Sequence, residues 1–185
     1  MAKVIYIVCN ANIVIIIELS KTLAFFYYII LPLAKLKSIY YMKYSETDIN
    51  RFLEAQESPF CGYEIALKEI QNGKKTSHWM WYIFPQFREF AHSSRAHYWG
   101  IIDKSEAVAY LEHPILGPRL REITLALLEH KDKSALEILG DIDARKLRSC
   151  MTMFDYISPN DIFGEVLDVF FQGERGGKTI RVISR

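Results

Sequence analysis

The residues with the clearest chemical potential lie in one short stretch, SHWMWYIFPQF, at residues 77–87. His78 could act as a general acid or base, because an imidazole titrates near neutral pH and its pKa shifts readily on burial. Trp79 and Trp81 could form a stacking wall for a planar ring, with Gln86 as a polar contact. The same side chains could equally form an ordinary aromatic core, in which the histidine only caps a helix or bonds to the backbone.

Hydroxyl and cationic residues further along the chain could complete such a site. SSRAHYW places Ser93 and Ser94 just ahead of an expected helix that contains Tyr98. The N–H groups at that helix end could bind an anion, or a serine could simply cap the helix. Other residues could meet a phosphate or carboxylate, with a solvated helix face as the alternative for each: Arg119, Lys146, Ser149 and Thr152.

Several other kinds of site find no support in the sequence. His92 and His97 are not spaced to share one helical face, and no paired set of cysteines and histidines is present, so no metal site is predicted. The serine-hydrolase pattern G-x-S-x-G is absent. GERGGKT, residues 173–179, is one residue too short for a phosphate-binding loop. The sequence therefore predicts no metal and no cofactor.

The overall charge limits the classes of partner. The chain has 185 residues, half of them apolar, and a formal net charge of +1. Such a chain is not drawn strongly to nucleic acid or to anionic membranes, so we expect no nucleic-acid partner. The three cysteines show no paired spacing, which favours reduced thiols in a cytoplasmic protein. The partner that these features suggest is a small anionic or nucleotide-like ligand.

The N-terminal extension, residues 1–41, differs from the rest of the chain. Its two apolar runs, residues 4–17 and 23–34, are separated by a charged segment. Each is shorter than the roughly 20 residues that a membrane-spanning helix needs. Three interpretations are open: a weak membrane anchor, a helix that joins the fold, or a spurious translation of upstream sequence ahead of Met42. Only the anchor would give the protein a membrane partner and a membrane-anchored location.

Residues 42–185 carry a predominantly helical pattern. Apolar residues recur at helical spacing between serine or aspartate start signals and glycine or proline stop signals. An alternating β pattern is seen at most in TIRVI, residues 179–183. The predicted fold is mainly α, a single compact multi-helix domain with little or no β. Its expected helices lie within residues 49–56, 63–70, 77–84, 105–113, 134–139, 144–154 and 161–171, and one more helix, opened by Pro114 or Pro118, reaches residue 128. The expected start residues include Ser45, Ser77, Asp143 and Asn160.

Four stretches of the chain resemble the domain of unknown function 1810 family. They are RFLEAQE, YEIALKEIQNGKKTSHWMWYIFPQ, EAVAYLEHPILGPRLREIT and KLRSCMTMF, and the resemblance runs from about residue 49 to 182. It implies a compact, largely helical fold and no established activity. Some members are labelled calpastatin-like, but inhibitor segments of that kind are disordered before binding, unlike this aromatic-rich chain. FREFAH replaces the family's usual glycine-rich turn after Gln86, which would alter the mouth of any pocket there.

The resemblance also carries over His113, whose role before Pro114 could be structural. The other motif positions that it carries over are His78, Trp79, Trp81, Gln86, Ser94, Tyr98, Arg119, Lys146, Ser149 and Thr152. Two functions are open. The first is a small-molecule site, enzymatic or not, for a nucleotide or ADP-ribose-like ligand, with His78 as acid or base, Trp81 stacking, and Arg119 or Lys146 at a phosphate. The second is a non-enzymatic protein-binding or regulatory module that exposes its aromatic cluster as a patch. A concave, polar-lined cluster would favour the first.

Overall fold

The computed structural model describes residues 3–9, 12–18, 29–32 and 44–185 of the chain. The chain divides into two units, residues 1–45 and residues 46–185, and each is described by itself.

The first unit contains a small antiparallel sheet. Its strands are β1 (Lys3–Cys9), β2 (Asn12–Glu18) and β3 (Ile29–Pro32), in the order β1-β2-β3. The described parts of the extension are therefore strands rather than the helix that we considered, consistent with their many β-branched residues. The rest of residues 1–41 lies outside the described residues. The membrane anchor and the spurious translation stay predictions from the sequence.

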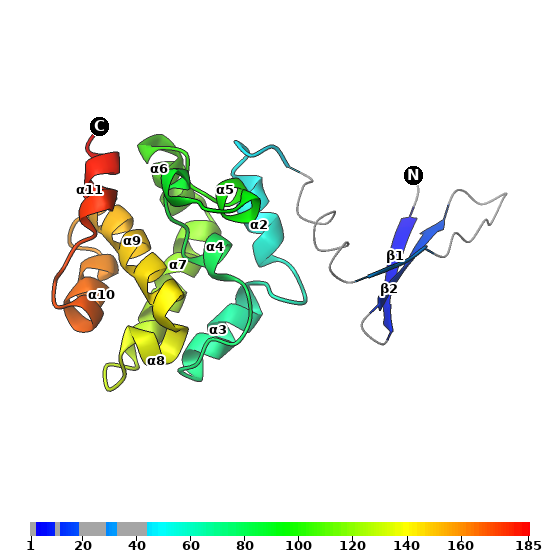
Figure 1. Ribbon diagram of the computed structural model, residues 1–185, viewed down its shortest axis with the longest axis horizontal. Helices are drawn as coiled ribbons and strands as arrows, with labels where there is room; N and C mark the ends of the chain where they lie inside the picture. The colour runs from blue at the N-terminus through cyan, green and yellow to red at the C-terminus, as the bar shows by residue number, and fades with distance from the viewer. Residues whose placement is uncertain (1–2, 10–11, 19–28, 33–43) are drawn as a thin grey trace. The chain divides into compact units, whose positions relative to one another are not determined.

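The second unit is helical, as predicted, and Figure 1 shows its helices packed around one another. Residues 44–185 contain ten α-helices and one short 3-10 helix, and their only β pairing is an isolated bridge between Phe87 and Ile101. The helices are α2 (Asn50–Gln56), α3 (Tyr63–Gln71), α4 (Met80–Ile83), η1 (Arg88–Phe90), α5 (Ser94–Tyr98), α6 (Lys104–Glu112), α7 (Leu116–Leu128), α8 (Ala135–Leu139), α9 (Asp141–Ile157), α10 (Ile162–Phe171) and α11 (Gly177–Ile183). No helix among the described residues combines the length and the apolar character needed to cross a membrane.

The two longest helices of this unit, α7 and α9, organise its core. Helix α9 packs against α6, α8, α10 and α11, and α7 packs against α3, α6 and α10. Their buried side chains recur every three or four residues, as in Ile123 and Leu127 of α7 and Leu147, Met151 and Phe154 of α9. This single apolar core fixes the positions of the shorter helices around the candidate site.

Several expected helix boundaries are wrong for local reasons. Gly140 adopts a positive φ of 80° and separates α8 from α9, so α9 begins at Asp141 and Asp143 is not its cap. Helix α10 is capped by Asp161 rather than Asn160. TIRVI is not a strand but part of α11, because packing against α9 overrides its β propensity.

Candidate functional site

Trp79 and Trp81 lie two residues apart but in different surroundings. Trp79 is fully buried, and its indole N–H donates a 2.8 Å hydrogen bond to Glu69 Oε2. Trp81 is half-buried and lines a pocket. The motif thus contributes one tryptophan to the core and one to a surface that a ligand can reach.

Glu69 at the end of α3 holds the segment that leads to these tryptophans. Its carboxylate accepts hydrogen bonds from the backbone and hydroxyl groups of both Thr76 and Ser77, as well as from Trp79. Partial burial raises the pKa of Glu69, but the bonds from Ser77, Thr76 and Trp79 outweigh it and lower the pKa to about 2. The hydroxyl of Ser77 therefore binds Glu69 and does not cap α4, which begins at Met80.

A pocket of about 520 Å³, open to solvent, is lined by the segment from residue 75 to 81 and by the corner between α8 and α9. The apolar residues that line it are Met80, Trp81, Leu139 and Ile142, together with Gly140. The polar residues that line it are Lys75, His78, Asp141, Asp143 and Lys146. Three of the predicted site residues, His78, Trp81 and Lys146, are brought together here.

Asp143 lies between two lysines of the pocket. Its carboxylate oxygens are 2.7 Å from Lys75 Nζ and 2.8 Å from Lys146 Nζ, and Lys75 also donates to the carbonyl of Ser77. Burial raises the pKa of Asp143, but the hydrogen bonds from Lys146 and Lys75 outweigh it, so the pKa lies below its ordinary value. The carboxylate stays ionised and ties α9 to the segment that carries Trp81.

Two cationic side chains also lie near the indole of Trp81. Lys146 Nζ is 5.0 Å and the Arg95 guanidinium carbon 5.8 Å from the ring centroid, within the range of cation–π attraction. His78 is exposed at the rim, where its imidazole can meet a ligand from solvent. The arrangement can hold a flat ring beside positive charge.

The other predicted residues do not line this pocket. Arg119 lies over the ring of Tyr63 at 5.0 Å, with Nη1 3.4 Å from Gln56 Oε1. Tyr98 is buried, and its carbonyl accepts from Arg51. Gln86 accepts a backbone hydrogen bond from Ile101 and has a half-buried side chain.

Ser94 is an exposed residue in the first turn of α5, and Ser93 caps that helix through a hydrogen bond from Ala96 N. Of the two serines, Ser93 therefore caps the helix, as the alternative interpretation predicted. His113, by comparison, accepts backbone hydrogen bonds from Ile115 and Leu116 at the start of α7, which is a structural role.

Ser149 and Thr152 contact the C-terminal segment rather than the pocket. The hydroxyl of Ser149 is 2.8 Å from that of Thr179, and Thr152 Oγ1 accepts a 2.9 Å hydrogen bond from Gly176 N. These bonds attach the GERGGKT segment to α9. Together with the short length of that segment, they give it a packing role.

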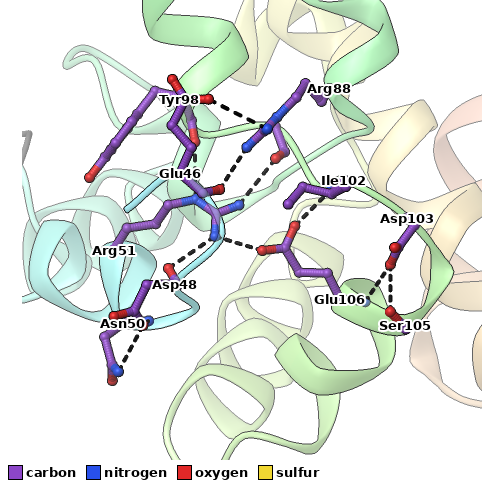
Figure 2. Close-up of polar contacts among 11 residues, drawn as sticks. Glu46, Asp48, Asn50, Arg51, Arg88, Tyr98, Ile102, Asp103, Ser105 and Glu106 are labelled. Atoms are coloured by element: carbon purple, nitrogen blue, oxygen red, sulfur yellow. Dashed lines mark hydrogen bonds and ion pairs between the residues drawn. The ribbon is translucent and has the colours of Figure 1, made fainter. Parts of the chain in front are cut away.

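A buried arginine forms a second charged cluster, which the sequence analysis missed. Arg51 of α2 is fully buried and donates to the carbonyls of Asp48, Tyr98 and Gly100 and, at 2.6 Å, to Glu106 Oε1. Figure 2 shows these bonds converging on the guanidinium, with the other Glu106 oxygen accepting from the backbone N–H of Ile102. The sequence could have indicated this burial, because Arg51 in RFLEAQE lies four residues before Ala55 and therefore on the same face of the helix, and Ala55 is buried.

No group of three or more histidine, cysteine, aspartate or glutamate side chains is placed to hold a metal ion within the part of the chain that the structure describes.

Comparisons with known proteins agree with the architecture of the second unit. The family described as DUF1810, protein of unknown function, matches residues 46–183. The crystal structure of the conserved hypothetical protein Rv1873 from Mycobacterium tuberculosis is similar, with 36% sequence identity and a TM-score of 0.71. The similarity covers 76% of this chain and 99% of that one. No curated protein is significantly similar to the chain.

Proposed function

Because the chain belongs to the DUF1810 family of proteins of unknown function, its activity must be argued from the site itself, and we propose that the pocket beside Trp81 binds a small, nucleotide-like ligand. The observation that carries this proposal is the half-buried indole of Trp81, which lines the pocket and has Lys146 Nζ 5.0 Å and the Arg95 guanidinium carbon 5.8 Å from its ring centroid. A planar base can stack on such an indole while an attached anion meets the cations.

The start of α9 adds to this environment. The first turn of this 17-residue helix lines the pocket, and Gly140, which precedes it, has no side chain that could cap the backbone N–H groups. The N-terminal end of a helix favours negative charge, so an anionic group of the ligand gains there as well. The proposal gives His78, at the rim, the role of acid or base toward the bound molecule.

The intrinsic fluorescence of the protein provides the test. Trp79 and Trp99 are buried, whereas Trp81 is half-buried, so a ligand in the pocket should quench mainly Trp81. Titration with AMP or ADP-ribose should give saturable quenching of the fluorescence, and Trp81→Phe should abolish this quenching. In calorimetry, the affinity of the same variant for the nucleotide should be about tenfold or more lower than that of the wild-type protein.

A matched control is Leu136→Ala. Leu136 is 57% exposed and does not line the pocket, so its removal should leave ligand affinity unchanged. Absence of saturable quenching and of binding heat with every nucleotide at millimolar concentration would overturn the proposal.

A second candidate function is a non-enzymatic protein-binding module. It is favoured by Leu136 and Ile142, which are 57% and 64% exposed on either side of the corner at Gly140. This function predicts that Leu136→Asp abolishes co-purification of a protein partner from expressing cells, whereas Trp81→Phe leaves it intact. If the pocket is a nucleotide site, Trp81→Phe should abolish the quenching in the fluorescence titration, whereas Leu136→Asp should leave nucleotide binding intact.

A further inference from the structure

The two lysines and one aspartate of the pocket form a cluster with one unbalanced charge. Lys75 and Lys146 contribute two positive charges, and Asp143, between them, contributes one negative charge. The three side chains are only 8%, 19% and 17% exposed. Charges withdrawn from water in this way are screened poorly by salt, so the excess positive charge persists locally.

The remaining charged groups at the pocket do not change this balance. Asp141 forms a 2.7 Å ion pair with Arg145, and both side chains are about two-thirds exposed, so the pair is neutral and strongly screened. Arg95, over the indole of Trp81, is also exposed to solvent. His78 is exposed at the rim.

We infer that the ligand of this pocket carries a single negative charge next to its planar ring, and that Asp143 sets this limit. The inference rests on the proposed function and narrows it. One anionic group balances the excess charge of the lysine cluster. A second would meet the carboxylate of Asp143, without a further withdrawn cation among the residues that line the pocket.

The chemical class that meets this requirement is a ring with one monoanionic group, either a phosphodiester or a carboxylate. A phosphomonoester carries close to two charges above neutral pH, and polyphosphates carry more. Such ligands place charge on the pocket that its side chains do not compensate. Asp143 thus acts as a specificity-determining residue, through the two lysines that it holds.

Calorimetry at pH 8 with adenine compounds of graded charge tests this limit. The series is adenosine, then cyclic AMP and adenosine 5′-carboxylate as the two monoanions, then AMP and ADP. In the wild-type protein, affinity should rise on the order of tenfold from adenosine to at least one monoanion and should rise no further for AMP and ADP. The two monoanions show which group, phosphodiester or carboxylate, the pocket accepts.

Asp143→Asn should remove the limit, so that AMP and ADP gain at least about fivefold over the monoanions. Asp141→Asn is the matched control, because it makes the same chemical change at an exposed position of the same pocket and should leave the order of affinities unchanged. If Asp143→Asn does not fold, as judged by its melting temperature, Lys146→Gln serves instead. That variant should cancel the advantage of the monoanions over adenosine.

The outcomes separate this inference from the proposed function. If no compound of the series binds the wild-type protein, both fail. If the compounds bind with an affinity that climbs steadily from adenosine to ADP, the single-charge limit is overturned while the nucleotide site stands. The limit is also overturned if Asp141→Asn changes the order as much as Asp143→Asn does.

Discussion

Two charged clusters of the helical unit place similar groups in different settings. Around Arg51, the guanidinium donates to three backbone carbonyls and to the carboxylate of Glu106 (Figure 2). Around Asp143, by contrast, two lysines share one carboxylate at the wall of an open pocket. The first cluster is complete without a ligand, whereas the second keeps a charge that a ligand can balance.

This difference distinguishes an internal support from a candidate site. A buried ion is tolerated when its partners satisfy it fully, and the loss of one partner is then costly. A cluster with an unbalanced charge at a pocket contributes less to stability and more to recognition. Substitutions around Arg51 should therefore affect stability more than ligand binding, and substitutions around Asp143 should affect ligand binding more than stability.

Arg51→Met should have the largest effect on stability. The free energy of unfolding should fall by about 3–5 kcal/mol, because Glu106 loses its buried partner and three carbonyls lose their donor. Urea unfolding followed by circular dichroism measures this loss. The double variant with Glu106→Gln should recover part of it, and a loss below about 1 kcal/mol would contradict the assigned role.

Glu69→Gln should come second, at about 2 kcal/mol near neutral pH, because a charged acceptor of several hydrogen bonds becomes a weaker one. The pKa of Glu69 is lowered from 4.5 to about 2 in the folded protein. Its stabilising contribution is therefore fully present above pH 4.5 and is lost as the pH falls toward 2. Unfolding measured between pH 7 and 2 should show wild type and variant converging in acid. A constant difference would contradict this.

Lys146→Met should lower the free energy of unfolding by about 1.5 kcal/mol, less than Arg51→Met does, since Asp143 keeps Lys75 as a partner. The same change should weaken nucleotide binding much more than Arg51→Met does in the fraction that remains folded. Parallel urea unfolding and calorimetry on the two variants test this contrast. Equal losses of stability in both would remove the distinction between the clusters.

His78→Ala should have the smallest effect on stability, within about 0.5 kcal/mol, because the side chain is exposed at the rim. Thermal unfolding checks this value. A melting temperature several degrees lower would show that the imidazole supports the fold, and would argue against its assignment to the site.

Much of the fold followed from local patterns in the sequence. The helical spacing and the proline and glycine stops predicted most of the helices, and Ser134 indeed begins α8 with a capping box. The start of α9 was placed too late because Asp143 looked like a cap. Asp143 instead lies in the first turn, where it pairs with Lys146 three residues on and with Lys75 from a distant segment, and only the structure shows this second partner.

The candidate site was predicted only in part. His78, Trp81 and Lys146 meet at one pocket, although Lys146 is more than sixty positions away in the chain. Sequence spacing gives no information on which residues approach across helices. For the same reason it could not show that Arg119 lies over Tyr63, nor that Trp79 turns inward to Glu69.

The attachment of Lys75 on both sides of the α8–α9 corner has a consequence for dynamics. Its backbone N–H bonds to the carbonyl of Ile138 before the corner, and its side chain bonds to Asp143 beyond it. The Lys75 amide can exchange its hydrogen with solvent only when it separates from α8. The deuterium uptake of this one amide therefore reports the opening of the corner, and a molecule that bridges the two walls of the pocket would slow that uptake.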